Sequence, residues 1–340
     1  MSAQQAEGWT RRRFLGGLTL TGTAGLLSLH ARPVAAEPPP ETTRIRLVQI
    51  PGICQAPQYV AEALLHSEGF TEVHYLKKAG TDGIETALAS GEADLNGHFA
   101  APALLWLEAG DPVVILAGLH IGCFELFATD AVRTIRDLQG KTVAVPALDN
   151  ARYVFLASMA AYVGLDLRKD LTVVTHPGPE SMRLLAEGQI DAYLGFSPEP
   201  QEMRAKQIGH VVVNSTVDRP WSQYFCCMLV GNRAFVRQHP VATKRALRAI
   251  LKAADVCALE PERAAQFMVD QDYTKRYDYA LQAMQEIPYG QWREYSAEDT
   301  LRFYALRLHE VGMLKSSPQK LIAQGTDWRF LNELKKVLKG

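Results

Sequence analysis

The stretch LASGEADLNGHFA, residues 88–100, has a second copy in the same chain: LAEGQIDAYLGFS, residues 185–197. Five of the thirteen positions are identical at an offset of ninety-seven: Leu88 and Leu185, Ala89 and Ala186, Gly91 and Gly188, Asp94 and Asp191, Phe99 and Phe196. Each copy follows a β-rich run and a short helical pattern: Val73–Leu76 and Gly83–Ala89 before the first, Leu171–Thr175 and Glu180–Ala186 before the second. A strand–helix–turn–strand unit that occurs twice predicts two similar α/β lobes.

Around the copies, strand and helix patterns alternate from Arg44 to about residue 230. The other predicted strands are Ile45–Ile50, Asp94–Phe99, Val113–Leu119, Lys141–Val145, Ile190–Gly195, Val211–Asn214 and Phe225–Val230. The longer helical patterns between them are Ala56–Ser67, Ala100–Glu108 and Ala151–Val163. The last third reads as helices only: Pro240–Leu259, Pro261–Gln271, Ala297–Val311 and Asp327–Lys339. Strands separated by helices predict an α/β fold with parallel sheets and helices on their faces.

The residues that follow each copied aspartate are the candidate binding residues. Asp94 and Asp191 we interpret as turn residues, each held by local hydrogen bonds after a helix stop. In an open parallel sheet, ligands bind beyond the carboxyl ends of the strands. We therefore expect the two segments after the aspartates to face one shared cleft, and Gly97 and Gly195 to let the backbone approach a ligand. The predicted contacts are His98, Phe99, Ala100, Phe196, Ser197 and Glu199.

Other strand ends contribute further candidates. Lys141–Val145 leads into a predicted helix start, with Asn150 or Asp149 as its cap. A helix N-terminus suits an anion, and Arg152 in the first turn would add a clamp for a sulfonate or carboxylate. The remaining candidates are Gln55, His120, Trp221 and Tyr224. For Arg152, a solvated surface position is the alternative; for the histidines and aromatic residues, it is packing in the core.

Composition agrees with a folded protein whose partner is not a nucleic acid. The chain has 340 residues, is 47% hydrophobic and 21% charged, and carries a formal net charge of −1. This length suggests about two domains, and a balanced charge provides no basic surface for nucleic acid.

The five cysteines are Cys54, Cys123, Cys226, Cys227 and Cys257. An odd number cannot all pair within one chain, and they lack CxxC or zinc-type spacing. Adjacent cysteines on a strand point to opposite faces, so Cys226 and Cys227 are not expected to bond to each other. We interpret all five as small buried apolar residues, and we predict neither a metal nor a cofactor.

The N-terminus is typical of an export signal. Arg11, Arg12 and Arg13 precede Phe14 and Leu15, and a short, weakly apolar run then leads to the small residues Val34-Ala35-Ala36. The run is shorter than the ~20 residues that a membrane helix needs. The arginines resemble a twin-arginine export signal. We expect residues 1–36 to be removed after Ala36, which leaves 37–43 as a Pro-rich linker and places the mature protein in the periplasm.

The order of these segments resembles a known family. It comprises PGICQAPQYVAEALLHSEGF (51–70), LASGEADLNGHFAAPALLWLEAGDPVVILAGL (88–119), LQGKTVAV (138–145) and ESMRLLAEGQIDAYLGFSPEPQ (180–201). This order is similar to the periplasmic substrate-binding proteins of ABC importers, in their nitrate/sulfonate/taurine and thiamine-precursor branch. The resemblance implies the two-lobed type II binding-protein fold, with a hinge and C-terminal helices. Lobe one would span 44–123 and 231–340, and lobe two 124–230, with crossings at Phe124–Thr129 and Phe225–Val230.

The same resemblance implies a monomeric receptor, not an enzyme, that delivers a small molecule to an ABC permease of the inner membrane. The helix-start argument favours a sulfonate, nitrate-like or other small organic anion, and a pyrimidine or thiamine precursor is the alternative. A third possibility is an enzyme, because the fungal thiamine-precursor synthases share this fold and use a cysteine-rich motif. Cys226-Cys227 is only a partial match to that motif, and no catalytic motif such as GxSxG is present.

Overall fold

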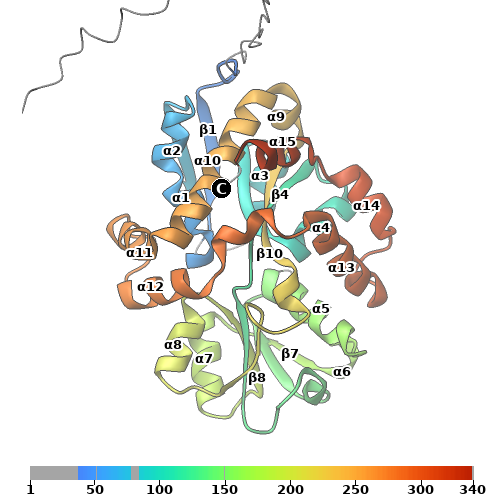
Figure 1. The fold of residues 1–340 in the computed structure, drawn as a ribbon. Helices are drawn as coiled ribbons and strands as arrows, with labels where there is room; N and C mark the ends of the chain where they lie inside the picture. The colour runs from blue at the N-terminus through green and yellow to red at the C-terminus, as the bar shows by residue number, and fades with distance from the viewer. Residues whose placement is uncertain (1–36, 51, 78–83, 149, 339–340) are drawn as a thin grey trace, which may run out of the picture. The chain divides into compact units, whose positions relative to one another are not determined.

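The computed structural model of the chain describes residues 37–50, 52–77, 84–148 and 150–338. The predicted signal segment, residues 1–36, lies outside the described residues, as do Gly83, Asp149 and Lys339. Among the described helices, none is both long and apolar enough to span a bilayer. The α/β class is confirmed: ten strands in three sheets are combined with helices over the described residues (Figure 1).

Two of the sheets lie on the N-terminal side of the chain. Sheet A pairs β1 (Arg44–Gln49) with β2 (Glu72–Lys77) in parallel. Sheet B has the order β3-β10-β4, in which β10 (Phe225–Asn232) runs antiparallel to β3 (Leu95–Phe99) and β4 (Val113–Ile121). All residues of β3, β4 and β10 are buried. The near-continuous apolar sequences of β4 and β10 require this burial, whereas β3 also buries Asn96 and His98.

Sheet C belongs to the middle of the chain and has the order β7-β6-β8-β5-β9. Its strands are β5 (Phe124–Ala128), β6 (Thr142–Val145), β7 (Thr172–Thr175), β8 (Ala192–Phe196) and β9 (His210–Asn214). Strand β6 is parallel to β7 and β8, whereas β5 is antiparallel to β8 and β9. Of the three sheets in the described residues, sheet A has the parallel pairing that was expected. Sheet B is antiparallel and sheet C is mixed, because β10 and β5 run against their neighbours.

The short N-terminal helices and α5–α8 accompany the strands of the two halves (Figure 1). They are α1 (Ala56–Val60), α2 (Glu62–Ser67), α3 (Ile84–Ser90), α4 (Ala100–Ala109), α5 (Ala151–Tyr162), α6 (Leu167–Asp170), α7 (Gly178–Ala186) and α8 (Glu199–Ala205). The 3-10 turns are η1 (Ile53–Gln55), η2 (Ile135–Leu138), η3 (Trp221–Gln223) and η4 (Tyr289–Arg293). The predicted helix Ala56–Ser67 is divided at Ala61 into α1 and α2.

The last third is helical, as predicted. Its helices are α9 (Arg233–Gln238), α10 (Pro240–Leu259), α11 (Pro261–Asp270), α12 (Tyr277–Glu286), α13 (Ala297–Glu310), α14 (Pro318–Gly325) and α15 (Arg329–Val337). Helix α10 packs against α1 and α2, and α13 packs against α4 and α5. Helix α4 follows β3 of sheet B, and helix α5 follows β6 of sheet C. By packing against both, helix α13 contacts both halves of the fold. Strand β10, which was expected to form the return crossing, lies within sheet B along its whole length.

The internal repeat is present in three dimensions. Gly91 and Gly188 end α3 and α7 with positive φ angles of 78° and 69°, as a C-terminal glycine does. Asp94 then accepts a hydrogen bond from the Arg46 amide at 2.7 Å. Asp191 accepts one from the Thr142 amide at 2.8 Å. Their partners lie 48 and 49 residues away, so the prediction of local turn bonds is wrong: each carboxylate joins its own strand to a neighbouring strand.

Candidate functional site

The end of the second copy lies against the end of the first copy and against the turn after β1. The Ile53 amide, at the end of sheet A, donates a hydrogen bond of 3.2 Å to the Ser197 carbonyl, at the end of sheet C. The rings of Phe99 and Phe196, equivalent residues of the two copies, have centroids 5.4 Å apart. A Cβ on Gly52 would lie 2.8 Å from the Phe196 ring, so only glycine fits there, and its φ of 140° also favours glycine. We call this meeting of Gly52–Ile53 with Phe196–Ser197 the closure contact.

Arg152 is buried at the start of α5, where it is already paired. One nitrogen lies 3.0 Å from Glu199 Oε1, another donates to the Tyr193 hydroxyl, and the guanidinium carbon lies 4.4 Å above the Phe196 ring. The Tyr193 hydroxyl donates to Glu199 at 2.8 Å. The surface alternative for Arg152 is therefore wrong, because its side chain is 8% exposed. A solute that used Arg152 would have to share it with Glu199.

The other residues near Arg152 fit this arrangement. Asn150 caps α5 by accepting the Tyr153 amide at 3.0 Å, as predicted. Tyr193 was not among the predicted site residues, because a tyrosine inside a strand is usually a residue of the hydrophobic core. Burial and the neighbouring Glu199 raise the pKa of Tyr193 well above its usual range, so the hydroxyl keeps its proton.

His98 is not part of the closure contact. Its ring stacks on Trp106 with centroids 4.2 Å apart, and it is 5% exposed. Neither ring nitrogen has a hydrogen-bond partner. Burial lowers the pKa of His98 to about 4, so the ring is neutral at pH 7. Ala100, the first residue of α4, is also buried.

Gln55 and His120 lie beside four cysteines at the junction of the two halves. We call Cys54, His120, Cys123, Cys226 and Cys227 the thiol cluster. The ligand atoms of Cys54, His120 and Cys227 lie within 4.8 Å of one another, and so do the sulfurs of Cys123, Cys226 and Cys227. Gln55 Nε2 donates to Cys227 Sγ at 3.3 Å, and its Oε1 fills the space that a Cβ on Gly97 would need. Gly97 therefore leaves room for the Gln55 side chain, and not for a ligand as predicted.

An irregularity in β10 brings the adjacent cysteines to one cluster. Its register against β4 shifts between Phe225 and Cys227 and again between Cys227 and Met228. Such a bulge re-aims a side chain, so the expectation that Cys226 and Cys227 face opposite sides is wrong. All five cysteines are buried, as predicted; they are also free, and four of them converge. The sequence did not indicate this because the members are distributed from residue 54 to residue 227.

Trp221 and Tyr224 are not part of the closure contact, and both pack against Phe303. Tyr224 stacks on Phe303 of α13, with centroids 4.1 Å apart, and Trp221 packs edge-on against the same ring at 5.6 Å. Trp221 also contacts Phe155, which stands between it and Phe124. Tyr224 and Phe303 line an outer cavity of about 680 Å³ together with Arg219 and Arg302. Both aromatic residues therefore follow the packing alternative: Tyr224 packs on Phe303 of α13, and Trp221 packs on Phe303 and on Phe155 of α5.

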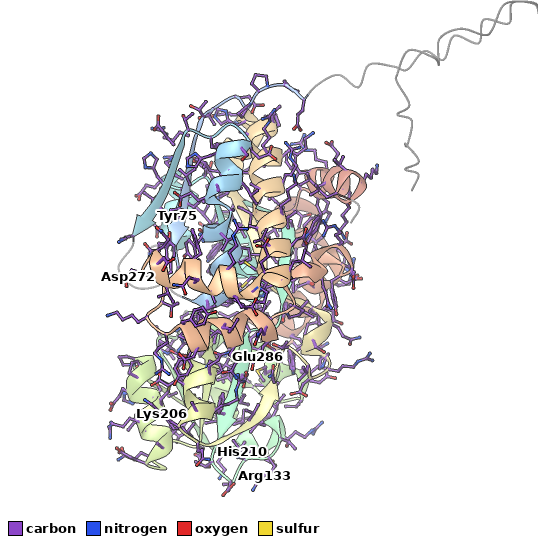
Figure 2. The ribbon with its side chains drawn as sticks, turned by 60° about the vertical axis from the view of Figure 1, so that its left-hand side comes forward. Tyr75, Arg133, Lys206, His210, Asp272 and Glu286 are labelled. Atoms are coloured by element: carbon purple, nitrogen blue, oxygen red, sulfur yellow. The ribbon has the colours of Figure 1, made fainter. Side chains whose placement is uncertain are left out.

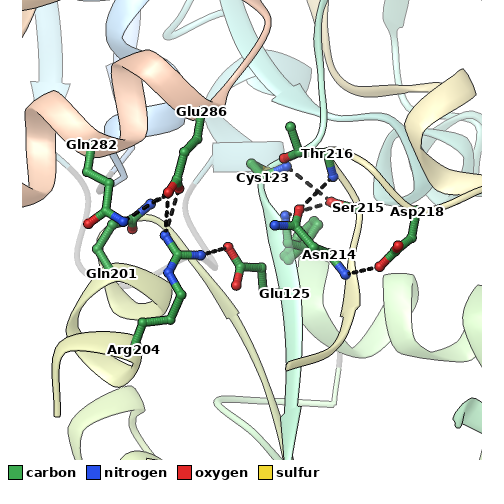
Figure 3. Close-up of polar contacts among 11 residues, drawn as sticks. Cys123, Glu125, Gln201, Arg204, Asn214, Ser215, Thr216, Asp218, Gln282 and Glu286 are labelled. Atoms are coloured by element: carbon green, nitrogen blue, oxygen red, sulfur yellow. Dashed lines mark hydrogen bonds and ion pairs between the residues drawn. The ribbon is translucent and has the colours of Figure 1, made fainter. Parts of the chain in front are cut away.

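Arg204 of α8 forms a polar bridge that the sequence did not indicate. It pairs with the buried Glu125 of β5 and, at 2.7 Å, with Glu286 of α12 (Figure 3). Gln201 also donates to Glu286, at 3.0 Å. In Figure 2 Glu286 lies at the end of α12 above the part of the chain that carries Lys206. Burial raises the pKa of Glu125, while Arg204 opposes that change. The bridge ties sheet C and α8 to the C-terminal helices.

Comparison with family models gives a match to the NMT1-like family over residues 38–269, more than half of the chain. The chain belongs to the NMT1-like family. A search of curated protein sequences found no match.

Solved structures support the two-lobed fold. The periplasmic nitrate-binding protein NrtA from Synechocystis PCC 6803 superposes with a TM-score of 0.73 at 16% identity, covering 88% of this chain and 90% of NrtA. The alkanesulfonate-binding protein SsuA from Xanthomonas axonopodis pv. citri, bound to MOPS, gives 0.65 at 16% identity, covering 86% and 100%. The aliphatic sulphonate binding protein SsuA from Escherichia coli gives 0.66 at 14% identity, covering 82% and 91%. At these identities the similarity establishes the fold.

Proposed function

We propose that this member of the NMT1-like family is an exported, monomeric receptor that captures a small solute between two lobes and delivers it to an ABC permease of the inner membrane. Export would use the twin-arginine-type signal in residues 1–36, and the mature protein would act in the periplasm. The lobes would separate near residues 123 and 224, with β10 counted in lobe one because it pairs within sheet B. Similarity to nitrate- and sulfonate-binding periplasmic proteins supports the class.

The observation that carries this proposal is the closure contact. It joins the carboxyl ends of strands from both halves, where α/β proteins bind ligands. A ligand closes a two-lobed protein only if it binds the closed state better than the open one. A solute bound beside the closure contact, touching both the turn after β1 and the end of β8, would meet this condition, because it would contact both lobes only when they are closed. The Arg204–Glu286 pair would then add to the closed state.

For the solute we propose a small organic anion of the sulfonate or nitrate type. The similarity in fold to nitrate- and sulfonate-binding proteins favours this class. Locally, the N-terminus of α5 and the buried Arg152 supply positive potential beside the Phe196 ring. Glu199 competes for Arg152 through the 3.0 Å ion pair, so the anion would bind only by taking over part of that pairing. Binding should therefore respond to Glu199 as well as to Arg152.

The test measures thermal shifts and then isothermal titration of the mature protein, residues 37–340, against nitrate, alkanesulfonates, carboxylates and pyrimidines. With an anion that binds, Arg152→Ala should weaken affinity by about 2 kcal/mol, roughly thirtyfold, because a buried charged partner is lost. Glu199→Gln should strengthen it, because Arg152 is released. Arg183→Ala, at an exposed arginine of α7, is the matched control and should leave affinity unchanged. If Arg152→Ala and Arg183→Ala bind equally well, the anion assignment fails.

A pyrimidine or thiamine precursor is the second candidate, and one observation favours it. The rings of Phe99, Phe124 and Phe196 contact one another, with centroids 5.0–5.9 Å apart, and Phe155 stacks on Phe124 at 4.5 Å. Such a group of rings would form an apolar wall for a flat heterocycle. A thermal shift with a pyrimidine and none with any anion would select this candidate. Covalent change of the bound compound, seen by mass spectrometry, would instead indicate an enzyme on this fold.

A further inference from the structure

We propose that the thiol cluster is a metal site: Cys54, His120 and Cys227 bind one soft, thiophilic ion of the Zn²⁺ or Cu⁺ class, and Cys123 or Cys226 completes its coordination. The site goes beyond solute capture and does not depend on which solute is bound. It lies where β4, η1 and β10 meet, at the junction of the two halves.

The spacing of the donor atoms fits one ion. Nε2 or Nδ1 of His120 and the sulfurs of Cys54 and Cys227 lie within 4.8 Å of one another. With metal–sulfur bonds of about 2.3 Å and metal–nitrogen bonds of about 2.0 Å, tetrahedral geometry sets neighbouring ligands roughly 3.5–3.8 Å apart. A contraction of about 1 Å therefore forms the site. The sulfurs of Cys123 and Cys226, 2.7 Å from each other, adjoin Cys227 and offer the remaining ligand.

His120 is oriented as a metal ligand would be. Its Nδ1 faces two backbone carbonyls, Ile121 O at 3.2 Å and Gly122 O at 3.0 Å, so Nδ1 carries the hydrogen and donates it. The lone pair then belongs to Nε2, which is buried and has no hydrogen-bond partner among the residues that the structure describes. Backbone carbonyls that fix the tautomer of a ligating histidine in this way are a usual outer shell of metal sites.

The backbone around Cys123 is fixed as well. Ser215 Oγ accepts the amides of Cys123 and Phe124 at 3.1 Å and 2.9 Å (Figure 3). Gly122 has a φ of 66°, and a Cβ there would lie 2.6 Å from Thr216 Cα. This turn admits only glycine, and it places Cys123 against Cys226 across 103 residues of sequence. The thiols are therefore held in place by the hinge between β4 and β5 and do not depend on flexible loops.

The chemistry of the donors selects the ion. The two ligand groups consist of thiols and one imidazole, without a carboxylate, which suits Zn²⁺ and Cu⁺ and disfavours Mg²⁺ or Ca²⁺. Two thiolates and a neutral histidine balance the charge of Zn²⁺, and a third thiolate from Cys123 or Cys226 leaves a net charge of −1. Each thiolate forms by releasing its proton as the metal binds.

The decisive experiment titrates the reduced mature protein with Zn²⁺ and, in a second series, with Cu⁺ buffered by a chromogenic chelator. We expect one equivalent to bind, and binding at least about tenfold weaker in Cys227→Ser and in His120→Asn. The matched control is Cys257→Ala: Cys257 is equally buried, lies in α10 outside both ligand groups, and should leave metal affinity unchanged. Co²⁺ in place of Zn²⁺ should produce thiolate-to-metal charge-transfer absorption that Cys227→Ser removes.

Three outcomes would overturn the proposal. Wild-type protein that binds neither ion is one, and equal weakening by Cys227→Ser and Cys257→Ala is another. The third is a disulfide between Cys123 and Cys226: denatured protein, purified without reductant, would then show three free thiols in place of five and no bound metal. Thermal denaturation without metal shows whether each variant folds. If Cys227→Ser does not fold, His120→Asn with the Co²⁺ spectrum decides the question.

Discussion

The two copies of the repeat share a backbone but differ in what surrounds them. In both, a glycine with positive φ ends a helix, and an aspartate exchanges hydrogen bonds with the start of a strand 48 or 49 residues earlier. The first copy is buried: the Asp94 side chain is 3% exposed and pairs with Arg46 at 2.5 Å. In the second copy the Asp191 side chain is 30% exposed, and Lys141 is 3.9 Å away.

The difference continues along the two strands. Position 98 holds a buried histidine, whereas the equivalent position 195 holds a glycine that faces Glu199. The first copy thus supplies apolar residues, and the second supplies Tyr193 and Phe196, which hold the ion pair of Arg152 and Glu199 beside it. One backbone unit is repeated in both halves, while the residues that differ between the copies determine the chemistry around it.

The largest expected difference between the copies is in the free energy of unfolding when each aspartate is replaced by alanine. Asp94→Ala should lower the free energy of unfolding by about 3 kcal/mol, because it removes a buried partner of Arg46 and the acceptor of a backbone amide. Asp191→Ala should cost about 1 kcal/mol, because its carboxylate is partly solvated. Urea denaturation of both variants measures the two values. Equal costs would mean that the burial of the first copy contributes nothing.

A smaller effect is the pH dependence of the unfolding free energy, which only the first copy should show, through His98. Because the pKa of His98 falls from 6.5 in the unfolded chain to about 4, the unfolded state binds more protons between these values. His98 therefore destabilises the fold as pH falls, by about 2 kcal/mol between pH 7 and pH 5. The unfolding free energy of wild type minus that of His98→Phe should show this change. Subtraction removes the contribution of other groups, such as Glu125, and a difference independent of pH would contradict the buried, neutral state.

The smallest effect should be equal in the two copies. Gly91→Ala and Gly188→Ala each place a Cβ at positive φ, where the strain is about 1 kcal/mol. Little else changes, since a Cβ meets open space at Gly188 and one amide nitrogen at 3.7 Å at Gly91. Thermal denaturation should give closely similar losses. A much larger loss for Gly91 would show that the helix stops are not equivalent.

The sequence predicted the fold to a large extent because the relevant signals are local. Hydrophobic runs, helix-ending glycines and the internal repeat lie within short windows, and they gave most strands and long helices close to their observed bounds. The short α12 and α14 were missed, because two or three turns give little periodic signal. The antiparallel β5 and β10 were not predicted as such, since strand direction depends on pairing with distant segments.

The candidate site was predicted less completely, because its contacts are long-range. The repeat indicated Phe99, Phe196 and Ser197, which do meet at the junction of the two halves. It could not reveal that Arg152 is paired with Glu199, or that Tyr224 turns toward Phe303. The convergence of the cysteines depends on a bulge and a hinge, and neither has a sequence signal at that distance.

If a solute closes the two lobes at the closure contact, the Ile53 amide should become protected, because that amide donates to Ser197 across the junction. Hydrogen–deuterium exchange measures this protection. With a solute that raises the melting temperature, we expect slower exchange in peptides containing Ile53, and no such slowing in peptides of α15, which lies at the far end of its half from the junction (Figure 1). Unchanged exchange at Ile53 with the solute bound would contradict closure at this contact.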